Sequence, residues 1–190
     1  MKKRISTVTS LLMLSLIMLH GCTTTQVVTD NSTPATQASE LIPYDELLDI
    51  GILPIDSNIP EDLAQIEEKL IVPDVRRAES SYISYQLKDT LELTGNWGAV
   101  RVTPESSKSV DLELQGKILE SDGEQLKILM RATDARGKVW FERTYEDMAS
   151  RFSYEKPKED PFQDLYNDIA NDLLGTREGF SREQLLEIKT

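Results

Sequence analysis

The side chains that could act as nucleophile, base or metal ligand are unevenly spread along the 190-residue chain. Its one cysteine and one histidine, Cys22 and His20, both end an N-terminal apolar run, whereas 33 carboxylates occupy the rest. If residues 1–21 are removed as a signal, the remaining chain has one thiol and no imidazole. His-ligated metal sites, Ser-His-Asp triads and Cys-His pairs are then excluded. We expect no metal, no catalytic residue and no enzyme of these classes.

Carboxylates are the remaining candidates for acid–base chemistry. Adjacent or alternating pairs are Glu67 with Glu68, Asp111 with Glu113, and Glu146 with Asp147. A glycosidase-like hydrolase needs two carboxylates at a defined separation in a cleft. Asp111 and Glu113 instead fall on the polar side of an alternating strand, which is typical of a solvated face. A carboxylate-dependent hydrolase is therefore the unfavoured alternative.

Two groups of residues are candidates for partner binding. Arg76 and Arg77 open a long helical segment beside Asp74 and Glu79, where they form either a docking pair for an acidic partner or local ion pairs, and we favour the ion pairs. Phe152 and Tyr154 lie in a stretch of aromatic and charged residues before the last helix. Aromatic loops are frequent recognition sites, so these two are the stronger candidates.

The N-terminus has the layout of a secretory signal. Lys2, Lys3 and Arg4 form a basic start, and an apolar core follows over 8–19. The core is shorter than the roughly 20 apolar residues that a membrane-spanning helix needs. Residues 1–21 are therefore predicted to be a signal peptide.

The end of this signal, Leu19-His20-Gly21-Cys22, resembles the lipobox of bacterial lipoproteins, although His20 replaces the small or aliphatic residue that is usual there. The resemblance implies that Cys22 becomes the N-terminus and carries diacylglycerol and an N-acyl chain (palmitate), with no other cofactor. Three acyl chains hold a protein firmly to a membrane. Thr23, in place of Asp, implies the cell outer membrane, with the domain in the periplasm.

Removal of the signal makes the chain more acidic. It deletes the three basic residues named above and no acidic one, so the formal charge moves from −12 to −15. Such a surface repels nucleic acid and anionic head groups. The protein partner that this charge favours is basic.

The expected organisation is a lipidated flexible tether over 22–43, a folded domain over 44–176 and a tail over 177–190 with a short solvated helix. The domain is predicted to begin with a buried strand over 47–55 and a helix between Pro60 and Pro73. A long helix over 74–94, ended by Gly95, follows. Its apolar stripe is Val75, Ala78, Tyr82 and Tyr85, continued by Leu87, Leu91 and Thr94.

After this helix, apolar residues recur at every second position, which is the pattern of β-strands. Strands are predicted over 97–103, from Val110, from Leu126 and from Val139, with hairpin turns at 121–123 and 134–137. Asp160 and Gln163 read as the capping box of a last helix that Gly175 ends. This order predicts an α+β fold, a mixed sheet with a C-terminal antiparallel meander and helices packed on it.

Several of these stretches, "LTGNWGAVRVTP", "DLELQGKI" and "LKILMRATDARGKV", resemble the N-terminal domain of TolB and related periplasmic lipoproteins, a group that includes LpoB, PelC and CsgG. The shared residues are structural: Gly95, Gly116 and Gly137 at turns or close contacts, and Asp111 and Asp134 beside strands. The resemblance therefore implies the fold, because members of one fold do unrelated work.

Together these observations predict a non-enzymatic, membrane-anchored adaptor or assembly factor in an envelope complex for secretion, polysaccharide export or surface appendages. Two alternatives stay open, an LpoB-like activator of a peptidoglycan synthase and a carboxylate-dependent envelope hydrolase. Ring formation of the PelC kind has no signal in the residues, and the sequence leaves a homo-oligomer open.

Overall fold

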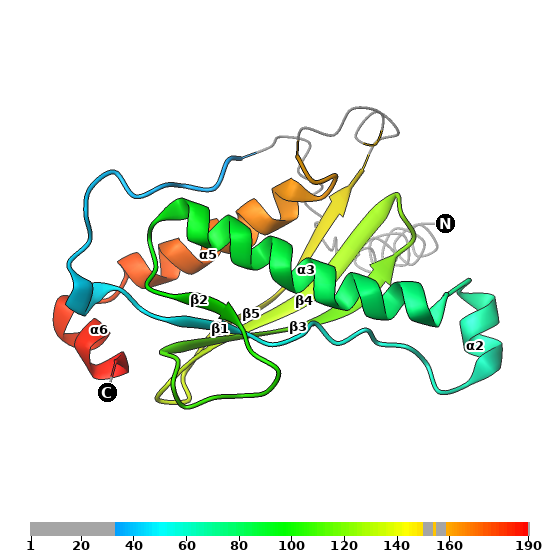
Figure 1. Ribbon diagram of the computed structural model, residues 1–190, viewed down its shortest axis with the longest axis horizontal. Helices are drawn as coiled ribbons and strands as arrows, with labels where there is room; N and C mark the ends of the chain where they lie inside the picture. The colour runs from blue at the N-terminus through cyan, green and yellow to red at the C-terminus, as the bar shows by residue number, and fades with distance from the viewer. Residues whose placement is uncertain (1–32, 150–153, 155–158, 190) are drawn as a thin grey trace, which may run out of the picture.

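The computed structural model describes residues 33–149, 154 and 159–189 (Figure 1). These residues form a five-stranded sheet in the order β2-β1-β3-β4-β5. Its strands are β1 (Ile50–Ile52), β2 (Val100–Val102), β3 (Leu112–Ser121), β4 (Gln125–Asp134) and β5 (Val139–Met148). β1 pairs in parallel with β2 and β3, whereas β3, β4 and β5 form the antiparallel meander. The predicted α+β fold with a mixed sheet is confirmed.

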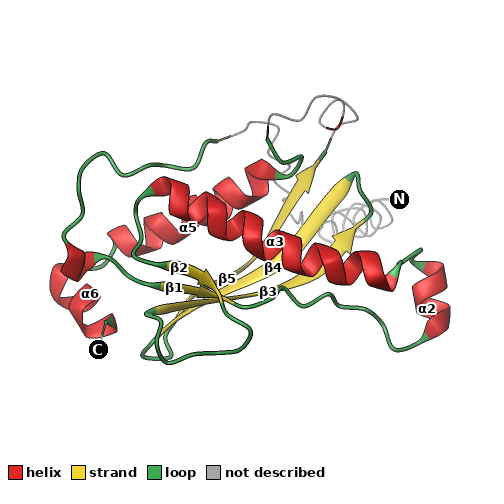
Figure 2. Ribbon diagram, viewed as in Figure 1, coloured by secondary structure: helices red, strands yellow, loops and turns green. Residues whose placement is uncertain are grey.

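The helices are a 3-10 turn, η1 (Tyr44–Glu46), and the α-helices α2 (Leu63–Glu68), α3 (Pro73–Thr94), α5 (Gln163–Glu178) and α6 (Arg182–Ile188). α3 and α5 lie side by side on one face of the sheet (Figures 1 and 2). α6 packs against η1 at the end of the molecule opposite α2. Within the described ranges, no helix is both long and apolar enough to cross a membrane.

The core lies between the sheet and these two helices. Alternate residues of β3 and β4 point into it, among them Leu112, Leu114, Ile128 and Met130, all almost inaccessible to solvent. The opposite face of the sheet is polar. There Lys127 on β4 pairs with Glu146 on β5 at 2.7 Å, and Arg131 pairs with Glu142 at 3.5 Å. The alternating pattern thus produces one buried and one solvated face, as predicted.

The bounds of α3 agree with prediction, and Gly95 ends it with φ 68°. The first part of its apolar stripe does not pack into the core, because Val75, Tyr82 and Tyr85 are more than half exposed. Ser80 and Ser84 are buried in their place. The chain beyond β1 runs as irregular backbone, and the two serine hydroxyls supply the partners of its polar groups: Ile55 N–H donates to Ser84 Oγ at 3.1 Å, and Ser80 Oγ donates to the Ile55 carbonyl. On this face of α3, the need to hydrogen-bond buried backbone groups outweighs the preference for burying apolar side chains.

The last two helices differ from prediction in their ends. α5 passes through Gly175, which faces open space and needs no special backbone conformation, and it ends at Glu178 with Gly179 as its C-cap. Asp160 does not cap it in a box: Asp160 Oδ1 accepts from Phe162 N–H, whereas the Gln163 amide donates to Thr90 and Asn167. The capping box belongs to α6, between Ser181 and Gln184.

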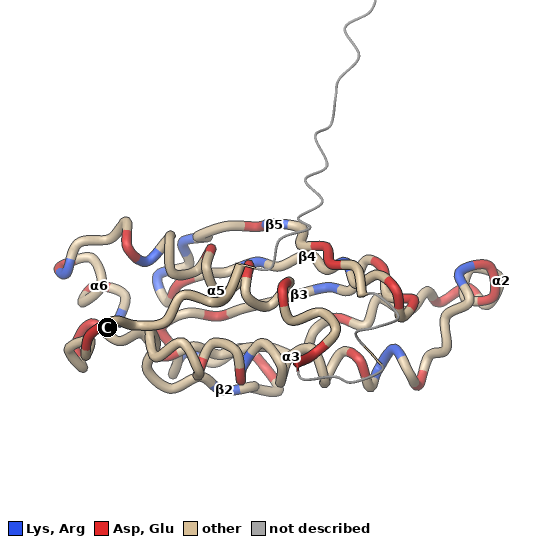
Figure 3. The backbone as a smooth tube through the Cα atoms, turned by 90° about the horizontal axis from the view of Figure 1, so that it is seen from above, with Lys and Arg blue, Asp and Glu red and all other residues tan. Residues whose placement is uncertain are grey.

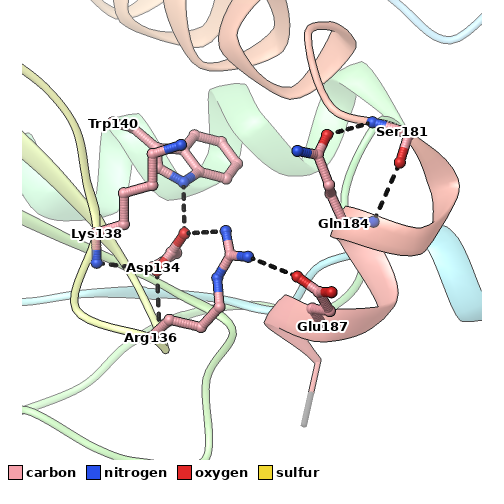
Figure 4. A network of polar contacts seen from close by, with 7 residues as sticks. All are labelled: Asp134, Arg136, Lys138, Trp140, Ser181, Gln184 and Glu187. Atoms are coloured by element: carbon pink, nitrogen blue, oxygen red, sulfur yellow. Dashed lines mark hydrogen bonds and ion pairs between the residues drawn. The ribbon is translucent and has the colours of Figure 1, made fainter.

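α6 was predicted to be solvated, but Leu185 and Ile188 are buried. A polar network fastens this helix to the β4–β5 turn (Figure 4). Asp134 accepts hydrogen bonds from Arg136 N–H, Lys138 N–H, the Arg136 guanidinium and the Trp140 indole, and Arg136 reaches Glu187 at 3.2 Å. Phe180, just before α6, packs against Trp140 with ring centroids 5.2 Å apart and the ring planes tilted by 41°.

The described part of the predicted tether lies against the domain. Asn171 on α5 accepts from Thr36 N–H at 2.9 Å and donates to the Pro34 carbonyl at 3.2 Å. Asn96 donates to the Thr36 carbonyl, and Ala38 N–H donates to the Thr94 carbonyl. We call residues 34–38 the strap. A composition rich in small polar residues is typical of linkers, but here asparagine amides outside the segment hold its backbone.

Candidate functional site

Two of the residues singled out from the sequence meet at the β3–β4 turn. The Arg76 guanidinium donates to the Ser121 carbonyl at 2.8 Å, and the Tyr154 hydroxyl donates to the Gly123 carbonyl at 2.6 Å. The turn itself has the predicted hairpin residues, with Gly123 at φ 91°. Two other candidates, Cys22 and Phe152, lie outside the described residues.

Arg76 holds this turn in place through its guanidinium group. It is 7% exposed, its Nε lies 3.0 Å from Glu79 Oε2, and Glu79 accepts from the Ser121 hydroxyl at 2.9 Å. The guanidinium is therefore engaged inside the protein and positions the turn. Arg77 is the exposed member of the pair and forms a 2.6 Å ion pair with Asp74 one helical turn before it.

Asp160 is the centre of the site. Its Oδ2 accepts a 2.6 Å hydrogen bond from the Tyr82 hydroxyl, and its Oδ1 accepts from the backbone of Phe162 at 2.8 Å. Tyr82 lies on α3, and Asp160 lies just before α5, so this contact joins the two helices. We call Tyr82, Tyr154, Tyr166, Glu79 and Asp160 the tyrosine–carboxylate cluster.

Burial and the nearby carboxylates raise the pKa of all three tyrosine hydroxyls. The hydrogen bond to Asp160 raises the pKa of Tyr82, and burial raises it further. Burial, then the charges of Asp160, Asp122 and Glu79, raise the pKa of Tyr154. Burial, reinforced by Asp160, also raises the pKa of the Tyr166 hydroxyl, which is inaccessible to solvent and has no hydrogen-bond partner among the described residues.

This arrangement suits a cation. Tyr82 and Tyr154 are each about half exposed and present aromatic faces, 52% and 51% of their surface being accessible. The nearby negative charge comes from carboxylates, and among the residues that the structure describes only Glu79 of the cluster has a cationic partner, Arg76. Lysine and arginine side chains bind to aromatic faces and to carboxylates, and tyrosine and arginine are enriched in protein interfaces. Within the described residues, no group of three or more His, Cys, Asp or Glu could hold a metal ion.

Of the carboxylate pairs considered for acid–base chemistry, Asp111 and Glu113 lie elsewhere, whereas the charge of Asp147 acts on Asp160 and Tyr166 of the cluster. Asp111 Oδ2 accepts from Asp49 N–H at 2.7 Å, and burial raises the pKa of Asp111. Glu113 accepts from the Gln115 amide at 2.7 Å on the polar face of the sheet. Asp147 is half-buried beside α5, and burial raises the pKa of its carboxyl too.

Tyr82 and Asp160 were not identified as site residues from the sequence. The signal that could have found Tyr82 is the presence of two apolar stripes on one helix, since a helix packed on a single sheet buries only one. Asp160 has no such signal, because its role depends on a residue 78 positions away.

No protein-family description and no curated protein matches the chain. Among solved structures, it is similar to a dodecamer of a PelC variant from Paraburkholderia phytofirmans, with 14% identity over 84% of this chain and 96% of that one and a TM-score of 0.38. It is also similar to the hypothetical protein CT253 from Chlamydia trachomatis, with 14% identity over 70% of this chain and 96% of that one and a TM-score of 0.40. Neither similarity is high enough to carry an inference about what this chain does.

Proposed function

We propose that this chain is an outer-membrane lipoprotein, anchored by the lipid on Cys22, whose domain faces the periplasm and acts as a non-enzymatic adaptor in an envelope complex. It binds a basic segment of another envelope protein at the tyrosine–carboxylate cluster. The anchor rests on the signal and the Gly21-Cys22 boundary, and the binding role rests on the cluster.

The observation that carries the binding role is the convergence on Asp160. The Tyr82 hydroxyl donates to Asp160, and the charge of Asp160 adds to burial in raising the pKa of Tyr154 and Tyr166. The side chains of Tyr82 and Tyr154 are about half exposed. Half-exposed aromatic side chains with polar tips supply contact area and hydrogen bonds at little entropic cost, which is why they recur in protein interfaces.

Electrostatics favours a basic partner at this end. The whole chain carries a formal charge of −12, so a cationic segment is attracted from a distance, and the attraction weakens as salt rises. A partner bound mainly by charge and aromatic contact forms its complex quickly and dissociates faster in high salt.

The anchor is tested by Cys22→Ser in the full-length chain. We expect the parent protein to sediment with membranes and to incorporate labelled palmitate, and the variant to lose both properties. A variant that still sediments and still labels would overturn the lipoprotein assignment.

The partner is tested with a photoreactive amino acid at Tyr85, which is 57% exposed one turn beyond Tyr82 and therefore reports on the site without removing it. The matched control places the same amino acid at Thr144, exposed on the open face of the sheet. We expect position 85 alone to crosslink, in intact cells, to a lysine- or arginine-rich segment of an envelope protein. Equal crosslinking at both positions, or none at position 85, contradicts the proposal.

A further inference from the structure

α2 is a helix that does not pack into the hydrophobic core. None of its residues is buried, and it projects from the end of the molecule beyond the start of α3 (Figures 1 and 2). Asp62 caps it by accepting from Ala64 N–H at 3.0 Å. Short helices are marginal in water unless an apolar face packs against something, so an isolated six-residue helix needs a further source of stability.

The end of α2 contains a strained residue. Leu70 N–H donates to the Glu67 carbonyl and Ile71 N–H donates to the Ile66 carbonyl, which is the hydrogen-bond pattern of a Schellman motif. Leu70 occupies the left-handed position of this motif, with φ 51°, where glycine is usual. Its side chain is also 87% exposed. A leucine at this position is unfavourable for both the backbone and the side chain of the free protein.

Three further exposed apolar residues lie at the same end of the molecule as Leu70. Leu63, Val72 and Val75 are 74%, 58% and 53% exposed, and they lie on α2, at the N-cap of α3 and in its first turn. We call these three residues and Leu70 the α2 apolar surface. Exposed apolar groups that gather at one place mark interaction sites more often than single exposed residues do.

The charges around this surface select its occupant. Residues 61–69 contain four carboxylates and one lysine. Glu61, Glu67 and Glu68 form no ion pair with another described residue, and Figure 3 shows acidic positions on the projecting α2. A second copy of this acidic chain and an anionic lipid surface are both repelled, whereas a segment with lysine or arginine beside its apolar residues is attracted.

We propose that the α2 apolar surface docks an amphipathic segment of a protein partner whose apolar anchors are flanked by lysine or arginine. The proposal rests on the proposed function for the partner's location in the envelope, and it adds a second contact at the N-terminal end of α3, the helix that carries Tyr82 of the tyrosine–carboxylate cluster. Binding orders α2 and gives the strained, exposed Leu70 a buried environment.

The experiment places the photoreactive amino acid at Gln65, exposed on α2, in the full-length chain in intact cells. We expect a crosslink to a basic, apolar segment. The variant Leu70→Gly keeps the Schellman motif, so we expect its thermal stability to equal or exceed that of the parent while the crosslink yield falls at least tenfold. Leu93→Ser, which removes a leucine that is 77% exposed at the other end of α3, is the matched control and should keep the yield.

The outcomes separate this proposal from the proposed function. A crosslink from position 65 to a second copy, to lipid or to an acidic segment overturns it, as does an undiminished yield in Leu70→Gly or no crosslink at all. If position 85 crosslinks and position 65 does not, the docking surface is wrong and the cluster stands. If only position 65 crosslinks, the docking surface stands and the cluster does not.

Discussion

The Tyr82 hydroxyl on α3 donates a 2.6 Å hydrogen bond to Asp160, which lies 78 residues further along the chain, just before α5. This bond joins the two helices that cover the sheet and sets the position of an exposed aromatic ring. The same carboxylate fixes the backbone that enters α5 through Phe162 N–H. The geometry of the candidate site therefore depends on this pair.

Tyr82→Phe tests the pair. Loss of a hydrogen bond to a half-exposed charged acceptor should lower the free energy of unfolding by about 0.5–1 kcal/mol in urea denaturation. Tyr85→Phe is the matched control, since Tyr85 has similar exposure and no hydrogen-bond partner among the described residues. Equal destabilisation by the two variants would show that the bond to Asp160 contributes nothing.

The Asp134 network predicts how stability depends on acid. Burial alone would raise the pKa of Asp134, but the hydrogen bonds from Arg136, Lys138 and Trp140 outweigh burial and lower it. A carboxyl whose pKa is lower in the folded state stabilises the protein above its unfolded pKa of about 4, and this contribution is lost as pH falls through the folded pKa.

Asp134→Asn should therefore destabilise the protein by about 2 kcal/mol at pH 7, because the Arg136 guanidinium loses its buried anionic partner and, among the described residues, keeps only the exposed Glu187. The difference from the parent protein should shrink as pH falls below about 4. Thermal unfolding followed between pH 2.5 and 7 measures this difference. A difference that stays constant with pH would contradict the assigned ionisation.

Two aspartates one turn apart on α5 should respond in opposite ways. Burial, and then the charges of Asp172, Asp164 and Asp147, raise the pKa of Asp168. A carboxyl whose pKa is higher in the folded state disfavours folding at neutral pH and does so less as pH falls through that pKa. Asp168→Asn should therefore raise the free energy of unfolding at pH 7, and the gain should vanish below pH of about 4.

Asp172→Asn is the counterpart. Asp172 Oδ2 accepts from Arg143 and from the Tyr145 hydroxyl, each at 2.7 Å. Removal of its charge should lower the free energy of unfolding by about 1 kcal/mol, and urea denaturation of both aspartate variants at pH 7 measures the two changes. If both variants shift stability in the same direction, the local electrostatics on α5 is misassigned.

The strap predicts a local change in amide exchange. Asn171→Ala removes the acceptor of Thr36 N–H and the donor to the Pro34 carbonyl, so the Thr36 and Ala38 amides should exchange about tenfold faster. The exposed Glu178, on the same helix, provides the control variant Glu178→Ala. Unchanged exchange at both amides would mean that Asn171 does not hold the strap.

The sheet could be predicted from the sequence because its signals are local. Leu112 and Leu114, Leu126 and Ile128 alternate with polar residues, and Gly123 and Gly137 mark the turns between them. The buried face of α3 could not be predicted from the sequence. Ser80 and Ser84 are buried because they form hydrogen bonds with the backbone of Ile55, and these contacts join residues that are distant in sequence. The contacts of the strap could not be predicted for the same reason, since they are made by Asn96 and Asn171, which are distant in sequence.

The candidate site was predictable only in part. Tyr154 stood out as an aromatic residue in a charged loop, and Arg76 stood out at the start of α3. Their common target, the β3–β4 turn, depends on how α3 and β5 lie on the sheet. Asp160 and Tyr82 are ordinary residues in sequence terms and acquire a role only when α3 and α5 pack together.

The decisive measurement is the crosslink yield from position 85 in intact cells after removal of one charge from the cluster. Asp160→Asn keeps an acceptor for Tyr82 and removes the negative charge, and Glu142→Gln removes one charge from the open face of the sheet, where Glu142 is exposed. If a basic partner binds at the cluster, Asp160→Asn should lower the yield at least fivefold, which corresponds to about 1 kcal/mol, whereas Glu142→Gln should leave it unchanged. Equal yields in the two variants would show that the cluster does not bind the partner.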